Sequence, residues 1–390
     1  MVMDVQAKPS TGADVCRGGS VPGKVQQTPG GVARNICECL ALLCNSDILP
    51  ASARERLRPL LVSVLGHDHA GDMLLAHMHS LGLPTHAIHR VPGASTPSVS
   101  IIFDNSGELA ASVADVAALE EHLPAVLRQH TADIQSAPLV ILDGNLSPEA
   151  LLEAAQMASE GGVPIWYEPV SAAKAVRATS ALHMMHYISP NAKELISLAE
   201  ALSSGPGRPR PTPSEAHKSQ THPSVSLRSS AGQSSSDGSA EAFADGSYRP
   251  FLNQGADAVG KARNAIEQLR LHLCTVLHAG VKCVVLTLGH MGAALCTLSG
   301  DRRWLEIEQM AALPAEVVNT SGAGDCLVAG TLFGILRGCS PVEALAHGMA
   351  VAHQAVQCSG SVPKNIDAGQ AQHRARAVLR SSQRYRLPVL

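Results

Sequence analysis

The chain of 390 residues is poor in aromatic side chains, which make up 3% of it, and its formal net charge is only −3. Few aromatics argue against base-stacking platforms for single-stranded nucleic acid. A nearly balanced charge gives no electrostatic footprint for nucleic acid or for an anionic membrane. No run approaches the roughly 18 apolar residues that a membrane span needs. We therefore expect neither nucleic acid nor a membrane as a partner.

The cysteines lack the paired spacing of a disulfide framework. Ten cysteines are scattered along the chain, and Cys37 and Cys39, two apart on a predicted helix, face different sides of that helix. No secretory signal peptide is visible in the first residues. These features predict reduced thiols in a cytoplasmic protein and leave import into an organelle open.

Apolar residues make up 45% of the chain, enough for a large core. Apolar strands alternate with helices of about ten or more residues, which predicts an α/β fold with a doubly wound, mostly parallel sheet flanked by helices. The predicted strands are 61–66, 85–91, 138–146, 163–170, 187–191, 281–289 and 293–298. The predicted helices are 36–43, 68–81, 148–159, 172–182, 192–202, 262–279, 323–336, 341–358 and a basic surface helix at 371–387.

Other segments stand apart from this core. The opening MVMDV is predicted to be the tail of a central strand that ends at Asp4, so this strand is short. Strands at roughly 10–28 and 85–115, with hairpin turn chemistry at 104–107, are expected to form a small sheet that acts as a lid. Residues 203–260 are rich in Ser, Pro and Gly, and we expect a disordered low-complexity insertion between 1–202 and 261–390.

The stretch 317–336, VVNTSGAGDCLVAGTLFGIL, carries the main candidate for chemistry. Gly322, Ala323, Gly324 and Asp325 fall where a turn becomes a helix. A helix start offers free N–H groups and a partial positive charge to a phosphate, and Asp325 places a carboxylate beside them. This arrangement suits phosphoryl transfer, with the carboxylate as the base. An ordinary capped helix is the alternative interpretation.

Polar side chains also follow the carboxyl ends of predicted strands, where doubly wound sheets bind ligands. Any one of them could be structural, but their number predicts a ligand crevice at this edge of the sheet. These side chains are Asp143, Asn145, Glu168, Asn191 and Glu194. Thr287 and Gly289 end a further strand and can accept a nucleotide.

Three motifs resemble, in this order, those of the PfkB (ribokinase-like) carbohydrate kinases. They are G-G-x-x-x-N at 30–35, N-x-x-E at 191–194 and T-x-G-A-G-D at 320–325. The resemblance covers nearly the whole chain outside 203–260 and implies a ribokinase-like fold with a small β-sheet lid. A closer resemblance, to the pseudouridine kinases of that family, is carried by the segments 23–40, 95–115, 166–174, 189–195 and 321–331.

The resemblance implies transfer of the γ-phosphate of ATP to the 5′-hydroxyl of pseudouridine, with Mg²⁺ as cofactor. Asp325 is then the general base, and the N–H groups of Gly322, Ala323 and Gly324 form the anion hole. Glu194 organises the magnesium through water. The implied substrate-binding residues are Asp4, Gly30, Gly31, Asn35, Asp115 and Asn145, with Lys24 as a further candidate. The implied nucleotide-binding residues are Asn191, Thr287, Gly289 and Gly292.

Several questions stay open at the level of sequence. Asn319 stands where relatives often have an Asp that helps to bind a monovalent cation, so dependence on K⁺ is in question. One alternative is a PfkB kinase for another nucleoside or sugar, such as adenosine, ribose or fructose. A second alternative is an inactive protein that binds a nucleoside. The resemblance also implies a homodimer through the lid.

Overall fold

The computed structural model describes residues 1–10, 19–46, 49–50, 52, 54, 57–105, 109–204 and 257–389. The chain divides into two units, one made of Met1–Ser203 with Ala256–Leu390, the other of Ser204–Gly255. The predicted insertion 203–260 lies almost wholly outside the described residues, although a helix begins within it at Asp257. The elements below make up the first unit.

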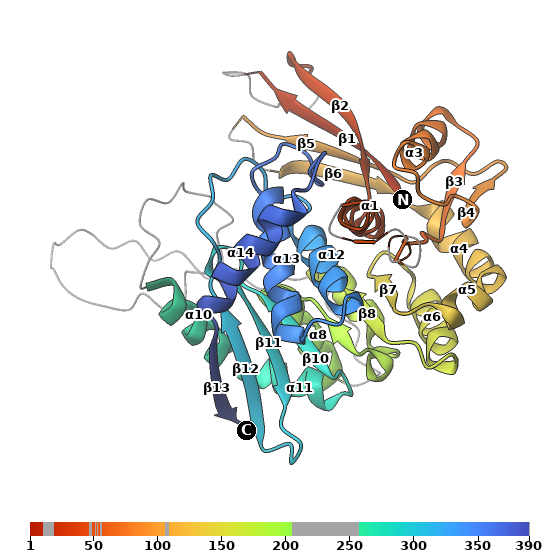
Figure 1. Cartoon of the computed structure of the whole chain (residues 1–390). Coiled ribbons are helices and arrows are strands. Elements are labelled where there is room, and N and C mark those ends of the chain that lie inside the picture. The colour runs from red at the N-terminus through yellow and green to blue at the C-terminus, as the bar shows by residue number, and fades with distance from the viewer. Residues whose placement is uncertain are drawn as a thin grey trace, which may run out of the picture. The chain divides into compact units, whose positions relative to one another are not determined.

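The secondary structure alternates strands and helices along most of the chain (Figure 1). The strands are β1 (Val2–Pro9), β2 (Gly23–Gly30), β3 (Ser63–Gly66), β4 (Ile88–Val91), β5 (Ser98–Phe103), β6 (Leu109–Asp115), β7 (Val140–Asp143), β8 (Ile165–Glu168), β9 (Tyr187–Ile188), β10 (Cys283–Thr287), β11 (Ala293–Leu298), β12 (Trp304–Met310) and β13 (Gln383–Pro388). The helices are α1 (Val32–Cys44), α3 (His69–Ser80), α4 (Ala117–Gln129), α5 (Thr131–Ser136), α6 (Pro148–Glu160), α7 (Ala172–Ala175), α8 (Ala192–Ser204), α10 (Asp257–Gln268), α11 (Arg270–His278), α12 (Ala323–Leu336), α13 (Pro341–Ala355) and α14 (Ala368–Arg380).

The largest sheet has seven strands in the order β13-β12-β11-β10-β9-β8-β7. Strands β7 to β10 are parallel neighbours, and β11, β12 and β13 continue the sheet as antiparallel strands. Strands β3 and β4 form a separate parallel pair. The predicted α/β class with parallel strands and covering helices is therefore confirmed.

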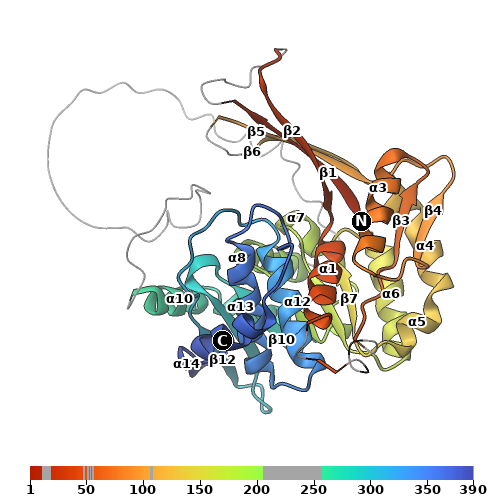
Figure 2. The ribbon, with the colours of Figure 1, turned by 45° about the horizontal axis from the view of Figure 1, so that its top comes forward.

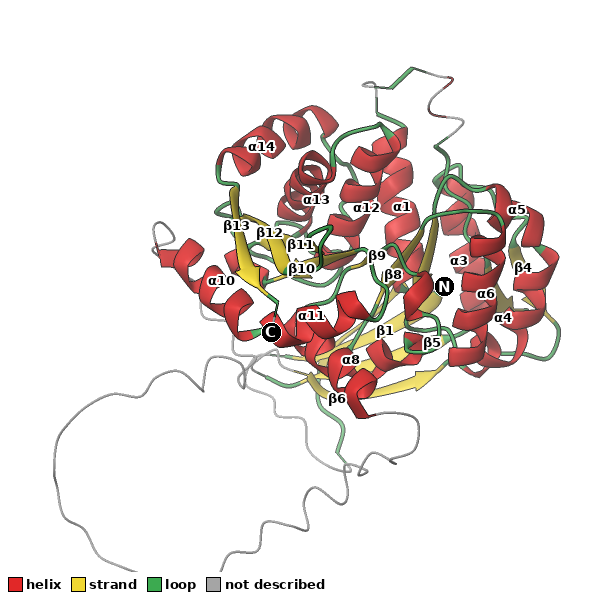
Figure 3. Ribbon diagram, turned by 90° about the horizontal axis from the view of Figure 1, so that it is seen from below, coloured by secondary structure: helices red, strands yellow, loops and turns green. Residues whose placement is uncertain are grey.

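Helices cover both faces of the seven-stranded sheet (Figure 3). Successive side chains of a strand point to opposite faces, and here they enter two different cores. On β8, Tyr167 packs with α6, α8 and α11, whereas Trp166 packs with α1, α12 and α13. On β10, Val284 and Val285 divide in the same way. Both faces of these strands are thus buried, which explains their continuous apolar runs.

Helices α12 and α13 pack closely because small residues line their contact. A Cβ atom at Gly330 would lie 2.9 Å from the Cα of Gly348, and a Cβ at Gly348 would lie 2.1 Å from Thr331 Oγ1. These glycines let the two helix backbones approach each other. The small residues of α12 are therefore required for its packing against α13. This packing holds in place the helix whose first residues form the predicted anion site.

Four strands form the predicted small sheet, in the order β2-β1-β5-β6 (Figure 2). The prediction for the first strand is wrong: β1 does not end at Asp4 but runs for eight residues to Pro9, and it belongs to this sheet. Its polar, partly exposed residues carry no apolar run, so the sequence hid its length. Residues 85–91 are also not lid, since β4 pairs with β3. The hairpin turn falls partly on 106–108, outside the described residues.

Three helix predictions need correction. Segment 172–182 holds only the short α7 followed by 3₁₀ turns, and 262–279 divides into α10 and α11. The tail prediction is wrong from Gln383 onward, because β13 pairs with β12 along the sheet edge. There Tyr385 and Leu387 point to the core side and Arg386 bonds Glu306 at 2.5 Å, so strand alternation outweighs the basic composition.

No helix in the described ranges is long and apolar enough to cross a membrane.

Candidate active site

The residue that precedes helix α12 has a left-handed backbone conformation. Gly322 precedes the helix with φ +77°, and a Cβ there would lie 2.0 Å from Ser361 O, so only glycine fits. The N–H of Ala323 donates to Thr320 O at 3.2 Å, whereas the N–H of Gly324 has no acceptor among the described residues. A Cβ at Gly324 would meet open space. The helix start can therefore bind an anion through its N–H groups.

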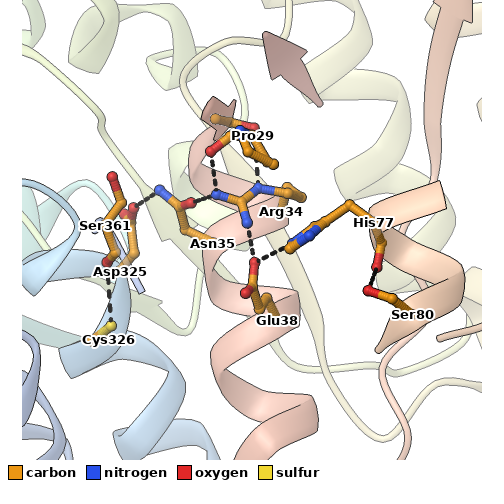
Figure 4. A network of polar contacts seen from close by, with 10 residues as sticks. Pro29, Arg34, Asn35, Glu38, His77, Ser80, Asp325, Cys326 and Ser361 are labelled. Carbon is orange, nitrogen blue, oxygen red and sulfur yellow. Dashed lines mark hydrogen bonds and ion pairs between the residues drawn. The ribbon is translucent and has the colours of Figure 1, made fainter. Parts of the chain in front are cut away.

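Asp325 lies in the first turn of α12 and is only 8% exposed. Asn35 of α1 donates from Nδ2 to Asp325 Oδ2 at 2.6 Å, which joins two predicted site residues 290 positions apart (Figure 4). Burial raises the pKa of Asp325 to about 6, with a further rise from Asp143, while Asn35 and Arg34 act in the opposite direction. A carboxyl group with this pKa is poised to accept a proton near neutral pH.

The end of β7 meets the start of α1. Asp143 is buried and accepts from the N–H of Ala33 at 3.1 Å and from the N–H of Asn145 at 2.8 Å. Lys174 of α7 donates from Nζ to Asn145 Oδ1 at 2.6 Å. Burial lowers the pKa of this lysine, although Asp143 opposes the shift. The predicted Asn145 thus belongs to a polar group beside the Asn35–Asp325 pair.

The Gly-Gly turn brings β1 against α1. The carboxylate of Asp4 occupies the space that a Cβ at Gly30 would need, with Oδ2 at 2.2 Å from that position. Gly31 has φ +97° and accepts from the N–H of Asn35 at 2.9 Å. Burial raises the pKa of Asp4, and Arg34 lowers it. Asp4, Gly30, Gly31 and Asn35 therefore lie together, as expected.

A second group of carboxylates lies at the ends of β8 and β9. Glu194 is 5% exposed, accepts from the N–H of Asn191 at 2.9 Å, and donates its own N–H to Asn191 Oδ1 at 3.0 Å. This reciprocal pair is a capping box that starts α8. Glu168 accepts from the Ser189 hydroxyl. Burial raises the pKa of Glu168 well above its usual range, and the charges of Asp325 and Glu194 raise it further.

The predicted nucleotide residues lie beside this group. Asn191 and Thr287 form an isolated parallel bridge, so the N-x-x-E motif and the end of β10 are adjacent. Gly289 has φ +59° and open space around a Cβ position. Gly292 has φ +107°, and a Cβ there would lie 2.1 Å from Met310 O, so its own packing against β12 accounts for the glycine.

Two predicted substrate-binding residues, Asp115 and Lys24, lie outside this cluster. Two side chains that were not predicted belong to it. Asp115 pairs with Ser98 at the end of β6, and Lys24 lies exposed on β2. Conversely, Arg34 and Lys174 contact site residues, but neither was among the predicted residues. Arg34 lies within segment 23–40 and Lys174 within segment 166–174, which carry the closer resemblance, but nothing local in the sequence singles out either side chain.

The fold matches solved structures of kinases. Ribokinase from Arabidopsis thaliana, complexed with ribose and ATP, aligns with a TM-score of 0.64 at 19% identity, covering 96% of both chains. A nucleoside kinase from Burkholderia thailandensis, in complex with inosine, aligns with a TM-score of 0.60 at 16% identity, covering 99% of this chain and 97% of that one. The fold is thus that of a ribokinase-like α/β protein.

The sequence comparisons define the family. The model of the pfkB family carbohydrate kinases matches residues 9–222 and 254–368. A pseudouridine kinase from Arabidopsis thaliana is 30% identical over 400 residues, covering 93% of this chain and 90% of that protein. A pseudouridine kinase from Escherichia coli is 34% identical over 186 residues, covering 48% and 55%. The chain belongs to the PfkB family of carbohydrate kinases, a family of ATP-using phosphotransferases, and the predicted family is confirmed.

Proposed function

We propose that this chain transfers the γ-phosphate of ATP to the 5′-hydroxyl of pseudouridine. The observation that carries the proposal is the buried Asp325, at the start of α12, hydrogen-bonded by the Asn35 amide. The similarity to two pseudouridine kinases supports this acceptor over other alcohols.

In the proposed reaction, Asp325 takes the proton of the acceptor hydroxyl as its oxygen attacks phosphorus. The pKa of about 6 leaves this carboxyl mostly ionised at neutral pH, so it is ready as a base. The N–H groups of Gly322 and Gly324 lie where the transferring phosphoryl group gathers negative charge, with Ala323 between them. Fixed donors at this place stabilise the transition state more than the ground state.

The acceptor is held on the other side of Asp325. Asp4 and the Gly30–Gly31 turn present oxygen atoms and backbone groups to the ribose hydroxyls, and Asn35 connects this region to the base. Asn145 and Lys174 form the neighbouring polar group. Holding both reactants in place supplies much of the rate enhancement in such a reaction.

The residues near Glu194 fit a magnesium ion. The charges of Asp325 and Glu194 raise the pKa of Glu168, so a divalent cation held near Glu194 would relieve this repulsion. Carboxylate oxygens such as those of Glu194 are the ligands that Mg²⁺ prefers, and Mg²⁺ commonly keeps several waters. No group of three or more His, Cys, Asp or Glu forms a ready metal cage within the described part. Glu194 would therefore act through water, and the ion would neutralise charge on the phosphates.

We also propose a homodimer through the small sheet. The strand register places Val25, Ile102 and Val113 on the face opposite Asp4, and Val25 and Val113 are 70% and 73% exposed. Covering such an apolar face by a second copy removes it from water. Light scattering that gives the mass of a monomer would reject the dimer.

The test of the function is ADP release by the purified chain with Mg-ATP and a panel of acceptors. The panel contains pseudouridine, uridine, adenosine, ribose and fructose, each with and without K⁺. A kcat/KM that is highest with pseudouridine would support the full proposal. A preference for another acceptor would support the kinase activity but reject pseudouridine as the substrate. Binding of a nucleoside without any ADP release would favour the inactive binding protein. Asn319 is uncharged and bonds the backbone groups of Ser321 and Ser359, so K⁺ activation stays an open question that the paired assays with and without K⁺ decide.

A further inference from the structure

Arg34 is the most enclosed cation next to the candidate site, with an exposed fraction of 3%. Its Nε donates to Gly30 O at 3.2 Å and its Nη2 to Pro29 O at 2.8 Å. The same guanidinium donates to Asn35 Oδ1 and to Glu38 Oε2 (Figure 4). One side chain thus contacts the Gly-Gly turn, the amide beside the base and an acidic partner.

These contacts decide which way the Asn35 amide points. A guanidinium has donors and no acceptor, so the amide atom facing Arg34 must be the oxygen. The amide nitrogen then faces Asp325, where it donates at 2.6 Å. With the amide turned by 180°, a nitrogen would face the guanidinium and an oxygen would face the carboxylate, which are two repulsive contacts. Arg34 therefore permits only the orientation that hydrogen-bonds the base.

We propose that Arg34 is a positioning residue for phosphoryl transfer, which locks the Asn35 amide as a donor to Asp325 and fixes the Gly30 turn of the acceptor site. The inference rests on the proposed function, because positioning matters only if Asp325 is the base. It adds to that function a residue that never touches the reacting atoms.

Arg34 is itself anchored from a third helix. Glu38 lies one turn further along α1 and is bonded by His77 Nε2 of α3 at 2.9 Å, so the guanidinium is held from both sides. The titratable groups around the arginine are Glu38 and Cys37 on α1, Asp325 on α12 and Asp4 on β1, which all raise its pKa against burial, together with the Met1 ammonium, whose pKa Arg34 lowers. Asp143 on β7 also acts on Asp325. The net effect of Arg34 on the base is to lower the pKa of Asp325.

The test compares Arg34→Lys and Arg34→Met with the unaltered chain. Lysine keeps the positive charge but cannot contact Asn35 and the carbonyl groups of Pro29 and Gly30 together. Methionine loses both the charge and these contacts. We expect kcat/KM for the acceptor to fall roughly 10²-fold in both, the usual effect of a misplaced reacting group. ATP affinity, measured by calorimetry without acceptor, should change less than about twofold. The acid limb of kcat/KM should move to higher pH in both variants, because both loosen the Asn35 hydrogen bond that lowers the pKa of Asp325, and it should move further with Met, which also removes the positive charge.

Arg128→Met is the matched control, since this arginine is 58% exposed and pairs with Glu153 between two surface helices. It should leave kcat/KM and the pH profile unchanged. If Arg34→Met melts before it can be assayed, Arg34→Met combined with Glu38→Gln removes one buried positive and one buried negative charge, which leaves the net charge of the site unchanged. A kcat/KM of Arg34→Met within about threefold of the unaltered chain would overturn the inference.

A crystal structure of Arg34→Met decides the inference without any turnover. We expect the Asn35 amide to leave Asp325 or to adopt mixed orientations. An amide that stays on Asp325 as in the unaltered chain would overturn the inference. Lack of turnover by the unaltered chain on every acceptor would instead reject the proposed function, while the crystal structure still judges the role of Arg34.

Discussion

At the scale of single residues, burial gives Asp325 its chemistry. The carboxyl is taken out of water by α1 and α12, which raises its pKa to about 6, and the Asn35 hydrogen bond limits the rise. A higher pKa makes a carboxylate a stronger base, and a value below 7 keeps it ionised. The environment therefore tunes a common side chain for proton transfer.

Asp325→Asn should keep the fold and lower kcat by roughly 10²–10⁴-fold, the usual contribution of a positioned base. The variant should melt no lower than the unaltered chain at pH 7, because it removes a buried charge whose ionised form opposes folding. Steady-state kinetics and a thermal melt measure the two effects. Near-normal turnover in the folded variant would reject the assigned role.

The pH profile gives an independent check on this carboxyl. Since the base must be deprotonated, kcat/KM should rise as pH increases through about 6, the pKa of Asp325, and then level off. The pKa in the folded chain lies above the ordinary value of 3.8, so this group stabilises the fold less as pH rises from about 4 to 6. Initial rates between pH 4.5 and 8 measure the limb; a flat profile around pH 6 would contradict it.

At the scale of elements, the start of α12 depends on one backbone conformation. Gly322 and Gly338 both have positive φ, +77° and +80°, but only Gly322 has a close neighbour at the Cβ position. The strain of a left-handed alanine is thus common to both sites, whereas the contact with Ser361 belongs to Gly322 alone. The two glycines therefore form a matched pair.

Gly322→Ala should destabilise the chain by at least about 1 kcal/mol more than Gly338→Ala, which itself costs about 1 kcal/mol through φ strain. The first variant should also lose most of its turnover, because the N–H groups at the start of α12 must move. Gly338→Ala should retain it. Denaturant unfolding and ADP release measure both effects. Equal stability and equal turnover in the two variants would contradict the proposed anion site.

At the scale of the whole molecule, the kinase domain is assembled from two stretches of chain. The family model matches residues 9–222 and 254–368, and the described elements resume with α10 at Asp257. Elements on both sides of the interruption share one core, since Leu198 of α8 packs in the same cluster as Leu273 of α11.

Replacement of residues 205–255 by a Gly/Ser linker of about 12 residues should leave kcat within about twofold. The expected reason is that the active-site residues and both cores lie in the unit made of Met1–Ser203 and Ala256–Leu390. Steady-state kinetics on the purified variant measure the change. A large loss of kcat in a variant that still melts cooperatively would show that this segment contributes to catalysis.

Some elements of this fold could be predicted from the sequence alone because they depend on local chemistry. Apolar, β-branched runs such as 281–289 indicate buried strands. Gly322, three residues before Asp325, indicates a helix start because glycine and carboxylate placement follow from backbone geometry. The alternation of elements then determined the α/β class. Strands with one polar face escaped detection, as β1, β12 and β13 show, because their pairing depends on partners far along the chain.

The tertiary structure decided which side chains meet. Asn35 and Asp325 are 290 positions apart, and only the packing of α1 against α12 places their side chains at 2.6 Å. Likewise Arg34 carries no local signal, since its role arises from the amide and carbonyl groups that the fold brings around it. The sequence by itself determined the elements and the chemical groups available. Long-range packing decided the burial, and with it the pKa of the base.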